Sequence, residues 1–139
     1  WDALTRPQQE RSVGRRLEDG APLTGGGEFD DVDLTARDGD GRLAVARFSH
    51  VRRSHPDLNG GARIFRKGAN YEVLDGVEHE VGLLFSSYQA DLSAQFLPIQ
   101  LSLDEADALN EWTTAVGSAE FAVLPGFAEG EWLGQRLLA

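Results

Sequence analysis

The side chains that could carry redox or metal chemistry in this chain gather around two histidines. His50 and His55 lie five residues apart in the segment SHVRRSHP, and the remaining histidine is His79. A structural zinc site needs three or four protein ligands, and no HExxH spacing occurs here. A haem iron needs only one axial histidine, and the spacing does not choose between His50 and His55. The simpler alternative is a pair of surface histidines in a loop.

A short basic island surrounds these histidines in a chain that is otherwise acidic. Residues 51–76 carry a formal net charge of +2, whereas residues 77–139 carry -9 and the whole chain carries -10. The island could be a solvated loop, or it could line a pocket for a small anionic ligand. Its members are Arg52, Arg53, Arg63, Arg66 and Lys67.

Composition argues against several classes of function. The chain has 139 residues, which suits one domain with a modest core. The acidic balance argues against a nucleic-acid binder, and the lack of a long apolar run predicts no membrane span. There is no cysteine, so the chain cannot form disulfides, use thiolate catalysis or ligate an iron–sulfur cluster.

Other polar motifs give weaker signals. The DGDG segment at 38–41 lacks the Glu that completes a calcium loop, and the NGG segment at 59–61 lacks the ending of a phosphate-binding loop. Both are typical of turns. Glu111 lies between Leu109 and Trp112, close to an apolar helix face. It could reach solvent at the edge of that face, or it could accept a hydrogen bond from a buried donor such as a histidine N–H.

The expected elements are helices and strands separated by long loops, which is typical of a two-layer α+β domain. A Thr-x-x-Gln capping box at Thr5 predicts a first helix, and Gly, Pro and Asp clusters predict a long loop after it. A Ser-x-x-Glu box at Ser102 predicts a helix that ends at Gly117. In chain order we expect a helix over 1–16, loops over 18–41 and 50–61, strands over 62–65 and 81–88, helices over 91–101 and 102–117, a strand over 119–124 and a helical turn within 131–138.

Five segments occur together in an order that indicates a family. They are SHVRRSHP, NGGARIFRKGANY, GLLFSSYQADLSAQFLPIQ, DALNEWTTAVGSAEFAVLPG and EWLGQRLL. This series resembles the C-terminal half of the dye-decolourising (DyP-type) peroxidases, which are haem enzymes, and the resemblance runs nearly from end to end. It implies an α+β fold with a ferredoxin-like antiparallel sheet and helices, the second half of a two-domain peroxidase. Residues 1–139 would be its C-terminal, haem-ligating domain.

The resemblance implies roles for residues around a haem. His50 would be the proximal iron ligand, with His55 ranked second. Glu111 would accept a hydrogen bond from the proximal histidine, and such a carboxylate pushes electron density toward the iron. Arg66 would be the distal arginine, which keeps its charge and can also bond to a haem propionate, while Arg63 is a weaker candidate. The basic island would then neutralise the two propionates.

The same resemblance implies roles for apolar and aromatic positions. Phe85, with Leu84, would wall the distal face of the haem. Tyr71 and Trp112 match aromatic positions that could relay radicals to the surface, where a bulky dye can be oxidised without reaching the iron. Many family members have Arg-Arg-Gly where this chain has Arg-Lys-Gly at 66–68, which is a mild departure.

One departure from the family is large. The family's distal acid is an aspartate in a GxxDG motif of the N-terminal half, and no GxxDG occurs in this sequence. The chain opens at Trp1, after the point where the family's second half has its first strand. We therefore expect a domain that lacks this strand at its N-terminal edge. We also expect activity only together with a complementary N-terminal chain that carries the distal aspartate.

The activity implied by the resemblance is that of a haem b peroxidase, which reduces hydrogen peroxide and oxidises dyes, phenolic compounds or other aromatic donors. A second hypothesis is a haem-binding or iron-uptake-linked module without peroxidase turnover, and a third is an acidic interaction domain without haem. The sequence leaves open the natural reducing substrate, the subunit number, including a homo-oligomer, and the compartment. Many relatives are exported by the twin-arginine pathway, and we expect any such signal to lie before this chain.

Overall fold

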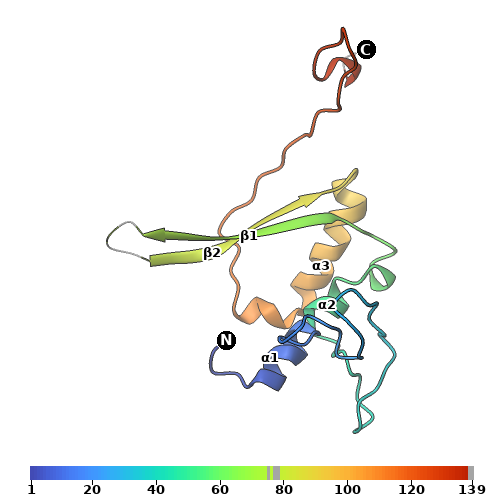
Figure 1. Ribbon diagram of the computed structural model, residues 1–139, viewed down its shortest axis with the longest axis vertical. Helices are drawn as coiled ribbons and strands as arrows, with labels where there is room; N and C mark the ends of the chain where they lie inside the picture. The colour runs from blue at the N-terminus through green and yellow to red at the C-terminus, as the bar shows by residue number, and fades with distance from the viewer. Residues whose placement is uncertain (75, 77–78, 138–139) are drawn as a thin grey trace.

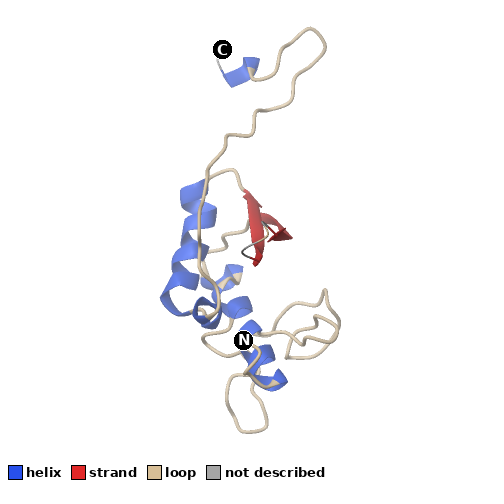
Figure 2. Cartoon of the chain, turned by 90° about the vertical axis from the view of Figure 1, so that its left-hand side faces the viewer, coloured by secondary structure: helices blue, strands red, loops and turns tan. Residues whose placement is uncertain are grey.

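The computed structural model describes residues 1–74, 76 and 79–137. A two-stranded antiparallel sheet lies beside a group of short helices, and the C-terminal segment runs away from both (Figure 1). Figure 2 shows the same arrangement from the side, with the helices in one layer and the strands in another. The predicted α+β class is therefore confirmed. Among the described residues, no helix is long and apolar enough to cross a membrane.

The first helix, α1, spans Arg6–Val13 and begins as its capping box predicted. The Gln8 side-chain oxygen accepts a 2.8 Å hydrogen bond from the Thr5 N–H. Gly14 ends the helix at φ 94°, in the left-handed region that glycine adopts without strain. The helix is shorter than the predicted 1–16 for this reason. A Cβ at Gly14 would lie only 3.1 Å from the Cβ of Val51, so the end of α1 packs closely against the segment that contains Val51.

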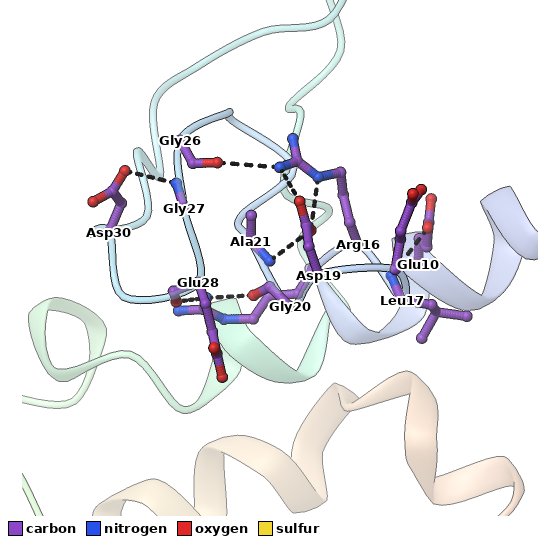
Figure 3. Close-up of polar contacts among 12 residues, drawn as sticks. Glu10, Arg16, Leu17, Asp19, Gly20, Ala21, Gly26, Gly27, Glu28 and Asp30 are labelled. Atoms are coloured by element: carbon purple, nitrogen blue, oxygen red, sulfur yellow. Dashed lines mark hydrogen bonds and ion pairs between the residues drawn. The ribbon is translucent and has the colours of Figure 1, made fainter.

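A long loop follows α1, as predicted for residues 18–41, and arginine side chains hold its turns together (Figure 3). Arg15 Nη1 donates to the carbonyl groups of Gly20 and Glu28, each at 2.7 Å. Arg16 pairs with Asp19 at 2.7 Å, and the bond from Arg16 lowers the pKa of the Asp19 carboxyl to about 2. Side-chain donors thus supply partners for carbonyl groups that no helix or strand pairs.

The sheet is one hairpin of two ten-residue strands, β1 (Phe65–Leu74) and β2 (His79–Tyr88). They pair antiparallel, with Phe65 opposite Tyr88 at one end and Leu74 opposite His79 at the other. The predicted strand over 81–88 is confirmed as β2. The predicted strand over 62–65 is wrong, because pairing begins at residue 65 and continues to 74. The sequence FRKGANYE has no apolar run, so its strand depends on pairing with β2 rather than on its own pattern.

The segment after the hairpin is helical, as predicted for 91–101, but it has two parts. A π-helical turn, η2 (Leu92–Phe96), leads directly into the α-helix α3 (Leu97–Ala106). Pro98 lies in the first turn of α3, where proline is tolerated because its missing N–H would have no helical partner. The proline therefore marks the start of α3 and does not interrupt it.

The predicted helix over 102–117 is wrong. Ser102 lies inside α3, and the chain leaves the helix at Asp107, which has extended backbone angles. One 3₁₀ turn follows, η3 (Ala108–Glu111), and residues 113–128 form neither helix nor strand. The Ser-x-x-Glu pattern does not cap a helix here because α3 runs continuously through Ser102, and both side chains contact Arg53 instead.

The C-terminal segment extends away from the rest of the structure (Figure 1). The predicted strand over 119–124 does not form, and Phe121 and Val123 are 83% and 76% exposed. A 3₁₀ turn, η4 (Gln135–Leu137), lies inside the predicted helical turn of 131–138, of which Leu138 lies outside the described residues.

The core is small and lies beneath two short helices that join α1 to the hairpin. These are α2 (His50–Arg53) and the 3₁₀ turn η1 (Pro56–Leu58). Most buried apolar side chains are short, so the core is thin, and α2 contacts both α1 and α3. The buried apolar residues are Ala21, Val45, Ala46, Ala62 and Ile99.

Candidate functional site

His50 is the first residue of α2, and a buried serine fixes the start of this helix. Ser49 is fully buried, and its Oγ donates to the Ala46 carbonyl at 2.9 Å. A helix of four residues has little stability of its own, so tertiary contacts must hold it in place. The His50 side chain is 28% exposed, which means that part of the ring is covered and part reaches the surface.

The covered side of the His50 ring faces a buried carboxylate. His50 Nδ1 lies 2.6 Å from Asp107 Oδ2, and the Asp107 side chain is only 4% exposed. An ionised carboxylate can only accept hydrogen bonds, so Nδ1 carries the ring proton and donates it. In the neutral ring the other nitrogen, Nε2, then keeps its lone pair and can bind a metal.

The Asp107 carboxylate is held in this position by its own backbone surroundings. Its second oxygen, Oδ1, accepts the Leu109 N–H at 3.0 Å. The neighbouring Ala108 N–H donates to the Phe48 carbonyl at 2.9 Å, just before α2. A buried carboxylate needs such hydrogen bonds in place of water, and here they also fix its orientation toward His50.

The prediction that Glu111 would be the carboxylate on His50 is wrong, because Asp107 occupies that place. Glu111 is exposed and lies at the end of η3. The turn at Asp107 ends α3 early, so Glu111 never continues the helix face on which it was expected. The sequence did contain a signal. Ile99, Leu103 and Asp107 recur at intervals of four, which puts a carboxylate in line with the buried row of a helix.

The structure divides the basic island between the fold and the surface. Arg52 Nη1 donates to the Leu34 carbonyl at 2.7 Å and so ties α2 to the long loop. Arg53 Nε donates to the Ser102 carbonyl at 2.8 Å and ties α2 to α3. The remaining three cations, Arg63, Arg66 and Lys67, are exposed on or just before β1.

Arg66 and Phe85 lie on the same face of the hairpin. Phe85 is paired with Gly68, and Gly68 lies on the Arg66 face of β1. Leu84 points to the opposite face, because successive residues of a strand alternate. Leu84 and Phe85 therefore cannot line one surface together, as the sequence suggested. Leu83 shares the face of Phe85, and its Cδ1 lies 3.2 Å from where a Cβ would stand on Gly68.

The two aromatic residues proposed as relays lie on different elements. The Tyr71 ring lies over Gly82 on β2, and its hydroxyl donates to the Glu80 carboxylate at 2.7 Å, which raises the pKa of Tyr71. Trp112 follows η3 and meets Trp1 edge to face, with ring centroids 5.2 Å apart and planes at 74°. The contact with Trp1 was not predicted from the sequence, since the two residues are far apart along the chain.

The other two histidines have structural partners. His55 Nδ1 accepts the Asp57 N–H at 3.2 Å and caps η1. His79 Nε2 lies 2.6 Å from Glu72 across the hairpin. In the part of the chain that the structure describes, no three His, Asp or Glu side chains cluster in a way that could hold a metal ion. This arrangement is consistent with a haem site, because haem iron needs only one protein ligand.

Comparison with known proteins decides the family. Residues 1–128 match the model of the family described as Dyp-type peroxidase, C-terminal. This chain belongs to the DyP-type peroxidase family. It is 45% identical to a dye-decolorizing peroxidase of Thermobifida fusca and 34% identical to a deferrochelatase of Shigella flexneri, each over 99% of this chain. A crystal structure of a DyP-type peroxidase from Cellulomonas bogoriensis superimposes with a TM-score of 0.89 at 47% identity.

The DyP-type chain spans only part of these relatives. It covers 33% of each of the two curated proteins and 38% of the crystallised chain, while 99% of its own residues are matched. The predicted fold, with a ferredoxin-like antiparallel sheet and helices, agrees with the fold of these solved DyP-type structures. The superposition covers 99% of this chain, so the hairpin and α3 lie within the matched part.

The residues of this DyP-type chain fit the family's cofactor, which is haem b with its iron. The test is the donor set at His50. One ring nitrogen is bound to a buried carboxylate, and the other is left with a lone pair on a partly exposed ring. This is the arrangement that orients an axial histidine and raises its basicity.

Proposed function

We propose that this chain is the haem-ligating part of a peroxidase that reduces hydrogen peroxide and oxidises dyes or phenolic donors. The observation that carries the proposal is the 2.6 Å hydrogen bond between His50 Nδ1 and the buried Asp107. In this proposal His50 Nε2 would hold the haem iron. Bound haem would supply the redox chemistry with peroxide, and the chain would supply orientation and charge.

Asp107 would act through His50. By accepting the Nδ1 proton in a hydrogen bond, it gives the imidazole part of the character of imidazolate, which makes Nε2 a stronger electron donor. Its burial matters because a carboxylate in water would be solvated and would polarise the ring less.

Arg66 would provide a fixed positive charge where peroxide reacts. Arginine does not lose its proton, so its charge does not depend on pH in the working range. Its exposed side chain shares a hairpin face with Phe85, an apolar residue that would limit water there. Tyr71 and Trp112 would carry electrons between surface donors and the interior, and the Trp1 ring beside Trp112 supports this role.

A complementary N-terminal portion would complete the enzyme. The proposal is supported by the chain's coverage of about a third of its curated relatives and by the missing GxxDG aspartate. Large apolar side chains are also exposed on both faces of the hairpin, which is unusual for the solvent-exposed surface of a monomeric protein. Leu83, Leu84 and Phe85 are 58%, 64% and 46% exposed.

Removal of the axial ligand tests the function. In the intact haem-loaded protein, His50→Ala should abolish the Soret spectrum of a histidine-ligated haem and peroxide-dependent dye oxidation. His55→Ala is the matched control, because His55 caps η1 and should leave both signals unchanged. A His50→Ala protein with an unchanged Soret band and normal turnover would rule out the assignment.

A second function is favoured by the deferrochelatase relative of Shigella flexneri, at 34% identity. The same His50 site could hold haem in a module linked to iron uptake, without peroxidase turnover. The two functions differ in one assay. A protein that binds haem through His50 and releases its iron, yet oxidises no dye with peroxide, would favour this second function.

A further inference from the structure

The short helix α2 is tied to α3 by a reciprocal pair of hydrogen bonds. Arg53 Nε donates to the Ser102 carbonyl at 2.8 Å, and Ser102 Oγ donates to the Arg53 carbonyl at 2.8 Å. Arg53 Nη2 also pairs with Glu105, one turn further along α3. The Arg53 side chain is 20% exposed, so this contact lies largely within the structure.

Two contacts attach α2 to its neighbours, one at each end of the helix. At the start of α2, the Ala108 N–H donates to the Phe48 carbonyl, and at the end, Arg53 bonds to Ser102. Rotation of α2 about its axis, or a tilt away from α3, would break at least one of these bonds. The His50 ring projects from the segment between the two ties, and Asp107 follows directly after α3.

We propose that Arg53 and Ser102 are positioning residues that keep the His50 ring in its hydrogen bond with Asp107. Through this bond they set how strongly His50 donates electrons to a bound iron. The inference rests on the proposed function of His50 as the axial ligand. It gives Arg53, a member of the basic island, a role inside the fold rather than a contact with a haem propionate.

The bond from Arg53 to the serine carbonyl, and not its ion pair, should carry this effect. Glu105 is 76% exposed, and an ion pair with an exposed partner contributes little because water and salt screen it. The bond from Arg53 Nε to the Ser102 carbonyl joins partly covered groups, and substitution of the Arg53 side chain removes it. The Ser102 hydroxyl bonds instead to the Arg53 backbone carbonyl, which also accepts the Asn59 amide and stays in place. Glu105→Gln is therefore the matched control for Arg53→Gln.

The test uses the iron–histidine stretching frequency of the intact, haem-loaded ferrous protein, measured by resonance Raman spectroscopy. This frequency reports how strongly the histidine donates, and Asp107→Asn gives the value without the carboxylate. Arg53→Gln should lower the frequency toward that of Asp107→Asn, and Ser102→Ala should lower it by less. Arg53→Lys should recover part of the loss, and Glu105→Gln should leave the frequency unchanged.

Two results would overturn the positioning role. One is a folded Arg53→Gln protein whose stretching frequency equals that of the unmodified protein. The other is an equal shift in Arg53→Gln and Glu105→Gln, which would assign the effect to the ion pair. Thermal unfolding of each variant shows whether a shift comes from a general loss of structure.

A haem-free measurement separates this inference from the proposed function. In the intact haem-free protein, ¹⁵N NMR of the His50 ring shows whether Nδ1 carries a hydrogen-bonded proton. Arg53→Gln should move the Nδ1 signal, and Glu105→Gln should not. If haem binds equally well without His50, the proposed function and the link to iron both fail. The NMR result then decides alone whether Arg53 holds the His50–Asp107 bond.

Discussion

Replacement of Asp107 by Asn tests the central contact of the site. The Asn side chain has almost the same shape, and Asn caps a helical turn as well as Asp does. The hydrogen bond that caps Leu109 can therefore survive, while the negative charge of Asp107 beside His50 Nδ1 is removed. The change isolates the charge, which Asp107→Ala would not do.

The size of the effect follows from the burial of this pair. A hydrogen bond to a charged group contributes about 1.5–3 kcal/mol, and the Asp107 side chain is only 4% exposed, so water screens its charge on His50 little. Since about 1.4 kcal/mol corresponds to a factor of ten, the loss is about 10- to 100-fold. Removal of groups that orient metal ligands costs a similar factor.

The assay is the rate at which the intact haem-loaded protein reacts with peroxide, followed at the Soret band by stopped flow. We expect Asp107→Asn to slow this reaction about 10- to 100-fold with haem still bound. Glu111→Gln is the control and should react at the normal rate, because Glu111 is exposed and His50 bonds to Asp107 instead. Normal kinetics in Asp107→Asn together with slow kinetics in Glu111→Gln would refute the reasoning.

Three further predictions concern Gly14, Tyr71 and Asp19. Gly14→Ala should destabilise the protein by about 1–2 kcal/mol, because Gly14 has φ 94° and packs against Val51, whereas Gly39→Ala, in open space, should leave thermal unfolding unchanged. Tyr71→Phe should reduce dye oxidation and spare the peroxide reaction, and Glu80→Gln should lower the pKa of Tyr71 in a titration at 295 nm, since the bond to Glu80 raises it. Asp19 should stay ionised until the pH falls to about 2, and carbonyl NMR should place its titration midpoint there. Its contribution to stability is therefore present above its ordinary pKa near 3.8 and is lost as the pH falls through 2. An Asp19 midpoint near 3.8 would mean that Arg16 does not bind it in solution.

The parts of the fold predicted correctly have signals within a few residues. The capping box at Thr5 marks the start of α1, and the apolar run at 81–88 marks most of β2. Strand β1 carries no such run, so its pairing decided its extent. Ser102 and Glu105 matched a local capping pattern, but a tertiary contact with Arg53 used both side chains.

The candidate site shows the same limit more clearly. The family resemblance predicted His50 as the ligand, whereas residue type and spacing left His55 equally open. The carboxylate beside it was misassigned because the choice between Asp107 and Glu111 depends on where α3 ends. That end is set by the turn at Asp107 and by its contact with α2, 57 residues away along the chain. The spacing of Ile99, Leu103 and Asp107 points to a carboxylate on the buried row, but it does not show where the helix ends.

This separation has a consequence for the order of events during synthesis. His50 leaves the ribosome 57 residues before Asp107, so this histidine exists for a time without its carboxylate partner. Contacts between distant segments form late, because the intervening chain must first be ordered. Haem captured by the nascent chain would therefore meet an unoriented histidine. Productive loading should wait until α3 has been made and has docked on α2.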